Sequence, residues 1–121
     1  MKSAAQFHIV LVTAPSRKVA RLLAKSALQA HLAACANLVP GVESHYWWRG
    51  RLESAGEILI IFKTIRRHLR PLEDLVLANH PYDTPEFVVL PLAGGNERYL
   101  DWLSRSVRPA GIRRATPHIE S

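Results

Sequence analysis

The sequence predicts an α+β fold of the ferredoxin-like class. Two helices would cover one face of a four-stranded antiparallel sheet, and a short helix would follow at the C-terminal end. Two observations carry this prediction: the apolar patterns follow the order β-α-β-β-α-β, and their period changes between 2 and 3.6 residues in the same order. The 121 residues suffice for one domain, predicted to span 1–107.

The first strand and helix are indicated by a change of period near Pro15. Residues 7–13 form an apolar run, interrupted only by His8, which is typical of a central strand. Ser16 is a suitable N-cap for the helix that follows. Apolar residues then recur at helical spacing, with basic residues between them, which predicts an amphipathic helix packed on a sheet; they are Val19, Leu22, Leu23, Ala27 and Ala30.

A long hairpin is predicted next. The second strand begins within 33–37, and Pro40-Gly41 breaks or bends it before alternation resumes through Trp48. Arg49-Gly50 predicts a tight turn in which Gly50 supplies the positive φ. The third strand runs over 51–64, and Gly56 within it predicts a bulge.

In the second half of the chain, prolines and glycines mark the predicted ends of helices and strands. Residues 69–76 predict a helix with Pro71 in its first turn, where the missing N–H costs little. Prolines at 81 and 85 end that helix in a rigid corner, and the apolar run 87–92 predicts the fourth strand. After Gly94-Gly95, residues 99–107 predict a third helix. The tail, 108–121, is predicted to be disordered.

Composition narrows the function. The net charge is +6, but the basic residues are spread along the chain, so we expect solvated faces and no nucleic-acid site. The sequence contains no apolar stretch of about 18 residues, so we expect no membrane-spanning helix. Residues 1–6 lack the hydrophobic core of a signal peptide. A lone cysteine, Cys35, suits a reducing compartment. We therefore expect a cytoplasmic protein.

Self-assembly is predicted from exposed apolar surface. Both long strands exceed the usual ~5–6 residues, so their hairpin projects past the helices. The second sheet face is apolar too, with no helix expected to cover it. An obligate oligomer would bury both the projecting hairpin and the uncovered sheet face. We expect its subunit interface to include Tyr46, Trp47, Trp48 and Trp102, because aromatic residues dominate such contacts.

Six stretches, in this order, resemble the CutA divalent-cation tolerance family over roughly residues 7–107. They include Leu11–Pro15, a second stretch from Leu32 to Gly41, and a third from Ser44 to Gly50. The remaining stretches are Glu57 with Lys63-Thr64, the corner His80–Glu86, and Tyr99–Leu103. Each motif alone is weak, but all six in order and at the family's spacing make a strong match.

The resemblance implies a ferredoxin-like fold, a compact homotrimer with hairpins that reach onto neighbouring subunits, and binding of divalent cations, copper above all. It also implies a likeness in shape to the PII signalling proteins, and it implies no catalysed reaction. Members with a proposed copper site place a cysteine where this chain has Val12, and paired histidines where it has Asn79 and His80. One ligand of three therefore remains, and copper(I) prefers sulfur ligands that Val12 does not supply.

Candidate metal ligands are His80, Glu86 and Cys35, each weighed against a structural role. His80 is the residue type for a metal ligand, but it can also cap the end of a helix or bond within the proline corner. Glu86 can act as a cleft carboxylate, or accept backbone hydrogen bonds or pair with Lys63. Cys35 lies in an apolar strand and is more simply a small buried hydrophobe.

Four functions compete at this stage. The first is a trimeric, non-catalytic, metal-binding or metal-responsive protein for copper or another divalent cation. The second is a PII-like trimer that binds a small anionic effector in a subunit cleft. The third is a purely structural trimer that anchors other proteins. The fourth, an RNA-binding domain of the same element order, is disfavoured because residues 58–62 are aliphatic where stacking rings are needed.

Overall fold

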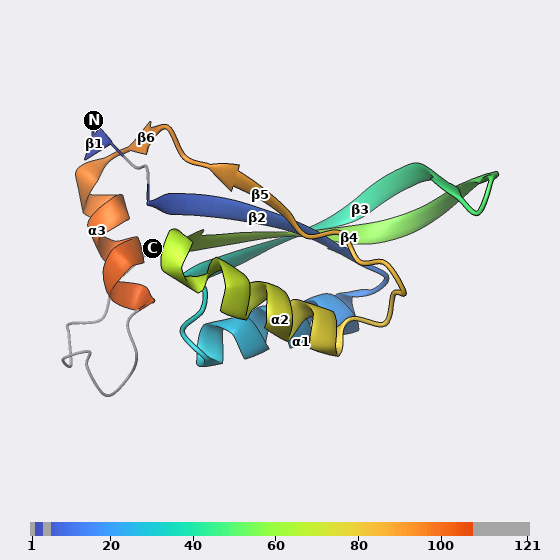
Figure 1. Ribbon diagram of the computed structural model, residues 1–121, viewed down its shortest axis with the longest axis horizontal. Coiled ribbons are helices and arrows are strands. Elements are labelled where there is room, and N and C mark those ends of the chain that lie inside the picture. The colour runs from blue at the N-terminus through green and yellow to red at the C-terminus, as the bar shows by residue number, and fades with distance from the viewer. Residues whose placement is uncertain (1, 4–5, 108–121) are drawn as a thin grey trace.

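A computed structural model describes residues 2–3 and 6–107 and confirms the predicted α+β class. Its main sheet has four antiparallel strands in the order β3-β4-β2-β5. Helices α1 and α2 lie side by side against one face of this sheet, and the β3-β4 hairpin extends well beyond them (Figure 1). The predicted tail, 108–121, lies outside the described residues.

The observed bounds lie close to the predicted ones. The strands are β1 (Lys2–Ser3), β2 (Phe7–Ala14), β3 (Cys35–Trp48), β4 (Arg51–Ile65), β5 (Val88–Pro91) and β6 (Gly94–Gly95). The helices are α1 (Arg17–Gln29), a 3-10 turn η1 (Arg66–His68), α2 (Leu69–Asn79) and α3 (Glu97–Ser106). Among the described residues, no helix is both long and apolar enough to cross a membrane.

Local chemistry sets the ends of the helices. The Ser16 hydroxyl accepts a hydrogen bond from the backbone N–H of Val19 at 3.2 Å, which confirms the predicted N-cap of α1. The Asn96 side chain caps α3 in the same way, accepting from the N–H of Tyr99 at 2.8 Å. Pro71 lies in the first turn of α2, as predicted.

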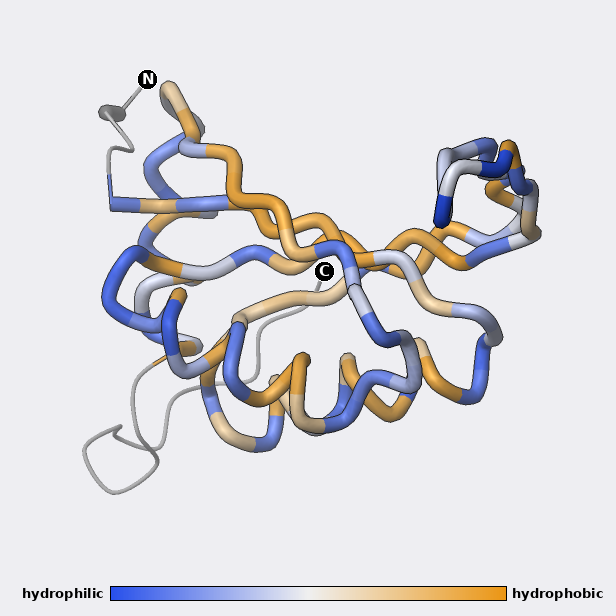
Figure 2. Tube along the Cα trace, turned by 45° about the vertical axis from the view of Figure 1, so that its right-hand side comes forward, coloured by the Kyte–Doolittle hydropathy of each residue, from blue (hydrophilic) through white to orange (hydrophobic). Residues whose placement is uncertain are grey.

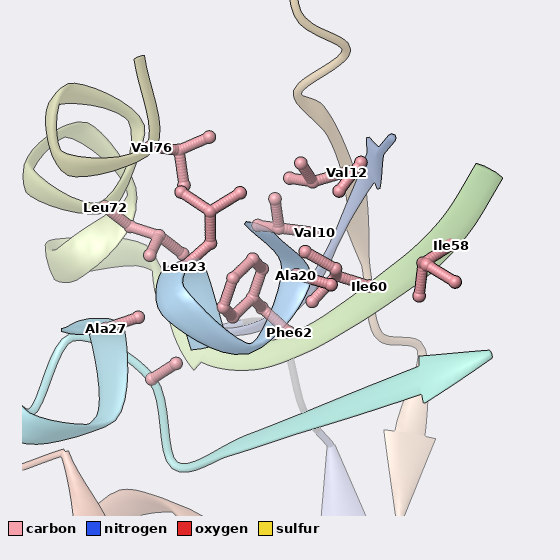
Figure 3. Packing of buried hydrophobic residues seen from close by; sticks show 12 residues of the cluster. Val10, Val12, Ala20, Leu23, Ala27, Ile58, Ile60, Phe62, Leu72 and Val76 are labelled. Atoms are coloured by element: carbon pink, nitrogen blue, oxygen red, sulfur yellow. The ribbon is translucent and has the colours of Figure 1, made fainter. Parts of the chain in front are cut away.

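The core lies between the sheet and the first two helices. Alternate residues of β2 and β4 point into it and meet the inward faces of α1 and α2, as Figure 3 shows for Val10, Phe62, Leu23, Leu72 and Val76. Hydrophobic residues follow the strands and recur on the helix turns that face the sheet (Figure 2). Burial of this apolar surface fixes the helices to one side of the sheet.

The hairpin is one continuous ladder with a single irregularity. Val39 pairs with Leu59 and Val42 with Glu57, so Pro40-Gly41 adds one residue to β3 and makes a bulge. The bulge predicted at Gly56 is wrong, because Gly56 pairs in regular register with Glu43. A glycine was an ambiguous signal there, whereas Gly41 has the positive φ, 78°, that a bulge uses.

The turn at the tip needs positive φ at two residues, not only at the predicted glycine. Arg49 has φ 51° and Gly50 has φ 76°, a pairing typical of the tight turns that match strand twist. The guanidinium of Arg49 lies 5.3 Å from the centre of the Trp48 ring, where a cation–π contact partly offsets the strain of Arg49.

The second face of the sheet is partly covered, contrary to the expectation that no helix reaches it. Helix α3 packs on the end of this face, around Phe7 and Ile65. A small sheet formed by β1 and β6, which the sequence did not predict, lies beside the N-terminal end of α3 (Figure 1). The uncovered remainder, called the open face below, comprises Ile9, Leu11, Val39, Leu59, Ile61, Val88 and Leu90.

The bulge provides a matched pair of glycine substitutions. Gly41→Ala should lower the free energy of unfolding by about 1–2 kcal/mol, because an L side chain is strained at this positive φ. Gly56→Ala should not lower the free energy of unfolding, because a Cβ at Gly56 meets nothing within 4 Å and the φ is ordinary. Urea unfolding at one fixed protein concentration measures both. Equal losses in the two variants would contradict the assignment of the bulge.

Candidate ligand cleft

A cleft of about 630 Å³ opens where the proline corner meets the base of the hairpin. Strand β2 stops at Ala14, paired with Ile58, while β3 and β4 continue together. The corner after α2 lies beside the space left by β2. The cleft is lined by Thr13, Ser44, His45, Tyr46, Trp47, Trp48, Glu57, Tyr82, Asp83, Thr84 and Glu86.

His80 ties the corner to the end of β2. Its ring Nε2 lies 2.7 Å from the carbonyl oxygen of Thr13, and its Nδ1 lies 3.1 Å from the backbone N–H of Tyr82. A carbonyl only accepts and an N–H only donates, so the ring is the neutral tautomer that carries its proton on Nε2. Both nitrogens are therefore occupied, which matches the structural alternative weighed for His80.

Tyr82 joins the corner to β4. Its hydroxyl donates to Oε2 of Glu57 at 2.6 Å, a short bond of the kind that a carboxylate acceptor makes. Burial, this hydrogen bond and the negative charge of Glu57 together raise the pKa of the Tyr82 phenol well above its ordinary range. The phenol therefore remains a proton donor to Glu57 at physiological pH.

Glu86 lies in the same cleft. Burial, followed by the charge of Glu57, raises the pKa of the Glu86 carboxyl above its ordinary value. The predicted pairing of Glu86 with Lys63 is wrong, because Lys63 lies at the other end of β4. The Lys63 ammonium is there 5.5 Å from the centre of the Tyr99 ring. Glu86 is instead one of the residues that line the cleft.

The third predicted metal ligand lies elsewhere. Cys35 pairs with Lys63 at the start of β3, and its thiol is 3.6 Å from Oδ1 of Asn37. Lys63 pairs with Ile9, four residues along β2 from Thr13, so Cys35 is displaced from the cleft by about 13 Å along the strand direction alone. Cys35 is also partly exposed and not the buried hydrophobe that the sequence favoured.

One chain does not bring the predicted metal ligands together. Across residues 6–107, no group of three or more histidine, cysteine, aspartate or glutamate side chains is placed to hold a metal ion. His80 and Glu86 share the corner, but both ring nitrogens of His80 are occupied. The donors of the described residues therefore do not fit a resident metal ion within a single chain.

The aromatic residues predicted at an interface divide into two groups. Tyr46, Trp47 and Trp48 line the cleft and remain partly exposed, with Trp47 at 73%. Trp102 lies on α3, packed against the small cluster around Phe7, with its ring 5.4 Å from that of Tyr99. Their role as interface residues stays a prediction.

Sequence reasoning missed Glu57 as a site residue. Only 9% of Glu57 is exposed, and its carboxylate accepts the hydrogen bond from Tyr82 that joins the corner to β4. The signal was present, since Glu57 directly precedes the apolar run 58–62 of a buried strand. An acid at such a position needs a partner, which the sequence alone does not identify.

Comparisons with known proteins place the chain beside one family. Residues 8–106 match the family model described as CutA1 divalent ion tolerance protein. The chain is 49% identical over 100 residues to the chloroplastic protein CutA of Arabidopsis thaliana, an alignment that covers 83% of this chain. The chain spans about half of that plant relative, 55% of its length.

Bacterial and structural relatives match over nearly their full length. The divalent-cation tolerance protein CutA of Thermus thermophilus is 47% identical over 96 residues, which cover 79% of this chain and 93% of the relative. The crystal structure of CutA1 from Oryza sativa superposes with a TM-score of 0.83 at 44% identity, covering 88% of this chain and 98% of that one.

The raised phenol pKa is measurable because the chain has three tyrosines. In a pH titration of tyrosine absorbance, we expect Tyr82→Phe to remove the component that ionises at the highest pH. Glu57→Gln should lower the pKa of Tyr82, because it removes the charge that opposes the phenolate. A Glu57→Gln profile identical to wild type would contradict the Tyr82–Glu57 coupling.

Proposed function

Because the chain belongs to the CutA1 divalent ion tolerance protein family, we propose that it serves tolerance to divalent cations as a non-catalytic homotrimer. Each trimer binds metal ions, copper among them. The single observation that carries the assembly is the open face, because apolar sheet residues left half exposed in one chain favour burial between copies. Val88 and Leu90 on the edge strand β5 are each 45% exposed.

The hairpin supports the same assembly. Beyond the end of β2 it is a two-stranded ribbon, and isolated ribbons of this kind are marginally stable in water. Its tip carries Trp47 and Leu52, which are 73% and 66% exposed. Packing against a neighbouring subunit gives this ribbon the apolar contact that its own chain does not supply.

Metal ligation in this proposal is completed between subunits. Among the described residues of one chain the donors do not converge, and both ring nitrogens of His80 are already hydrogen-bonded. Cys35 and Glu86 each keep a donor atom, and a closed trimer presents three copies of each. Thiolate suits copper(I), whereas carboxylate suits harder cations, so the metal that binds will identify which residue ligates it.

A small anionic effector, the ligand of the PII-like alternative, is a poor match for the cleft. The lining residues include no lysine or arginine, and they include the carboxylates of Glu57, Asp83 and Glu86. These carboxylates would repel an anionic effector bound among them, and partial burial strengthens that repulsion. We therefore keep the metal-binding trimer as the proposed function, with a cytoplasmic location still a prediction.

The open face can be tested with two leucine substitutions. Light scattering of the wild type should give three times 13.6 kDa. Leu90→Glu should shift the mass toward one chain, because a charge on the open face opposes its burial between subunits. Leu22→Glu, at a leucine 51% exposed on α1, should leave the trimer intact. A wild-type monomer at micromolar concentration would refute the assembly.

Metal titration tests ligation between chains. Metal-stripped wild type and Leu22→Glu should bind copper(I), copper(II) or zinc(II) saturably, whereas monomeric Leu90→Glu should lose saturable binding. His80→Ala should leave the dissociation constant unchanged, because its ring nitrogens are occupied, while it lowers stability by about 1–3 kcal/mol. A tenfold loss of affinity in His80→Ala, or full affinity in the Leu90→Glu monomer, would contradict the proposal.

A further inference from the structure

We infer that the cleft binds a small organic cation, one with an ammonium head, between the carboxylate of Glu57 and the aromatic side chains of the hairpin. This site goes beyond the proposed metal function. It rests on three observations of different kinds, which are the burial of one carboxylate, the absence of a counter-charge in the described chain, and the aromatic lining of the cleft.

Glu57 is a carboxylate that is nine-tenths buried and lines the cleft. Its hydrogen-bond partner is the neutral phenol of Tyr82. Among residues 6–107, no lysine or arginine forms an ion pair with Glu57. Burying a carboxylate is costly unless a positive charge compensates it, so the chain leaves room for a cation here.

The rest of the lining strengthens the same charge preference. Asp83 and Glu86 add two carboxylates, and the basic residue of the lining is His45, whose Nε2 is 2.7 Å from the carboxylate of Glu43. The chain as a whole carries +6, yet no lysine or arginine of the described residues lines the cleft. An acidic cleft in a basic protein selects cations over the anions that the overall charge would attract.

Aromatic rings distinguish an organic cation from a metal ion. Tyr46, Trp47 and Trp48 of β3 line the cleft, and Tyr82 lines it from the proline corner. An ammonium group gains from tryptophan and tyrosine faces as well as from a carboxylate. A bare metal ion needs several converging donor atoms, and the described residues present no such group. The volume of about 630 Å³ suits a small molecule.

The probe is choline, with its uncharged isostere 3,3-dimethyl-1-butanol as the matched ligand. Titration of the wild-type protein, followed by tryptophan fluorescence, should show saturable binding of choline. The isostere should bind about tenfold more weakly or worse, because it keeps the shape and loses the charge. Equal binding of both ligands, or no saturable choline binding at millimolar concentration, would overturn the inference.

Matched variants assign the binding to the cleft. Glu57→Gln keeps an acceptor for the Tyr82 hydroxyl and should weaken choline binding at least about tenfold. Glu53→Gln, on the same hairpin but outside the lining, should leave it unchanged. Circular dichroism and light scattering on each sample confirm fold and assembly. Unchanged affinity in a folded Glu57→Gln variant would overturn the assignment.

A comparison of monomeric and assembled protein tests whether a second copy of the chain fills the cleft. If a basic side chain of a neighbouring subunit neutralised Glu57, then monomeric Leu90→Glu would bind choline while the assembled wild type would not. That result would overturn the inference. Comparable choline binding by both would support a cleft that stays open to small molecules in the assembly. Metal titrations are run separately, so a failure here leaves the metal proposal untouched.

Discussion

The structure depends on one mismatch of length, because β4 pairs with β3 along almost all of its length but with β2 only as far as Ala14. Between Ile58 and Lys63, β4 has β2 on one side and β3 on the other, with the core beneath it. Between Arg51 and Glu57, toward the tip of the hairpin, β4 has only β3 as a neighbour. The end of β2 therefore creates the projecting ribbon and leaves beside it the space that becomes the cleft.

The proline corner meets that space in a defined conformation. Two prolines restrict the backbone of the corner, and His80 and Tyr82 fix it to β2 and β4 through side-chain hydrogen bonds. The ring centres of His80 and Tyr82 lie 4.6 Å apart, so the two anchors also contact one another. Because neither anchor is a strand hydrogen bond, the corner holds its place without extending the sheet.

The acidic character of the cleft also depends on where β2 ends. Glu57 is the first residue of β4 beyond its pairing with β2, so it has β3 on one side only and lines the cleft. Burial of the site, together with the charge of Glu57, raises the pKa values of Tyr82 and Glu86 above their ordinary values. The cleft is thereby polar and acidic at its base and aromatic along the hairpin.

The element order was predictable because periodicity and caps are local signals. Ser16 and Pro71 each act within one helical turn of their own position, and both predictions are confirmed. The two-residue strands β1 and β6 were not predictable, since a pattern of two residues has no period. The bulge was assigned to the wrong glycine, because the sequence shows a glycine but not its φ.

The site was less predictable than the fold, because its decisive contacts join distant parts of the chain. Tyr82 and Glu57 are 25 residues apart, and His80 and Thr13 are 67 apart. The sequence singled out the corner because stiff loops often carry functional side chains, and the structure places this corner beside the cleft. It assigned His80 to ligand or structure without deciding between them, and only the two hydrogen bonds of the ring settle where its nitrogens are used. A residue's chemistry could therefore be read from the sequence, whereas its availability depends on which distant groups the fold brings against it.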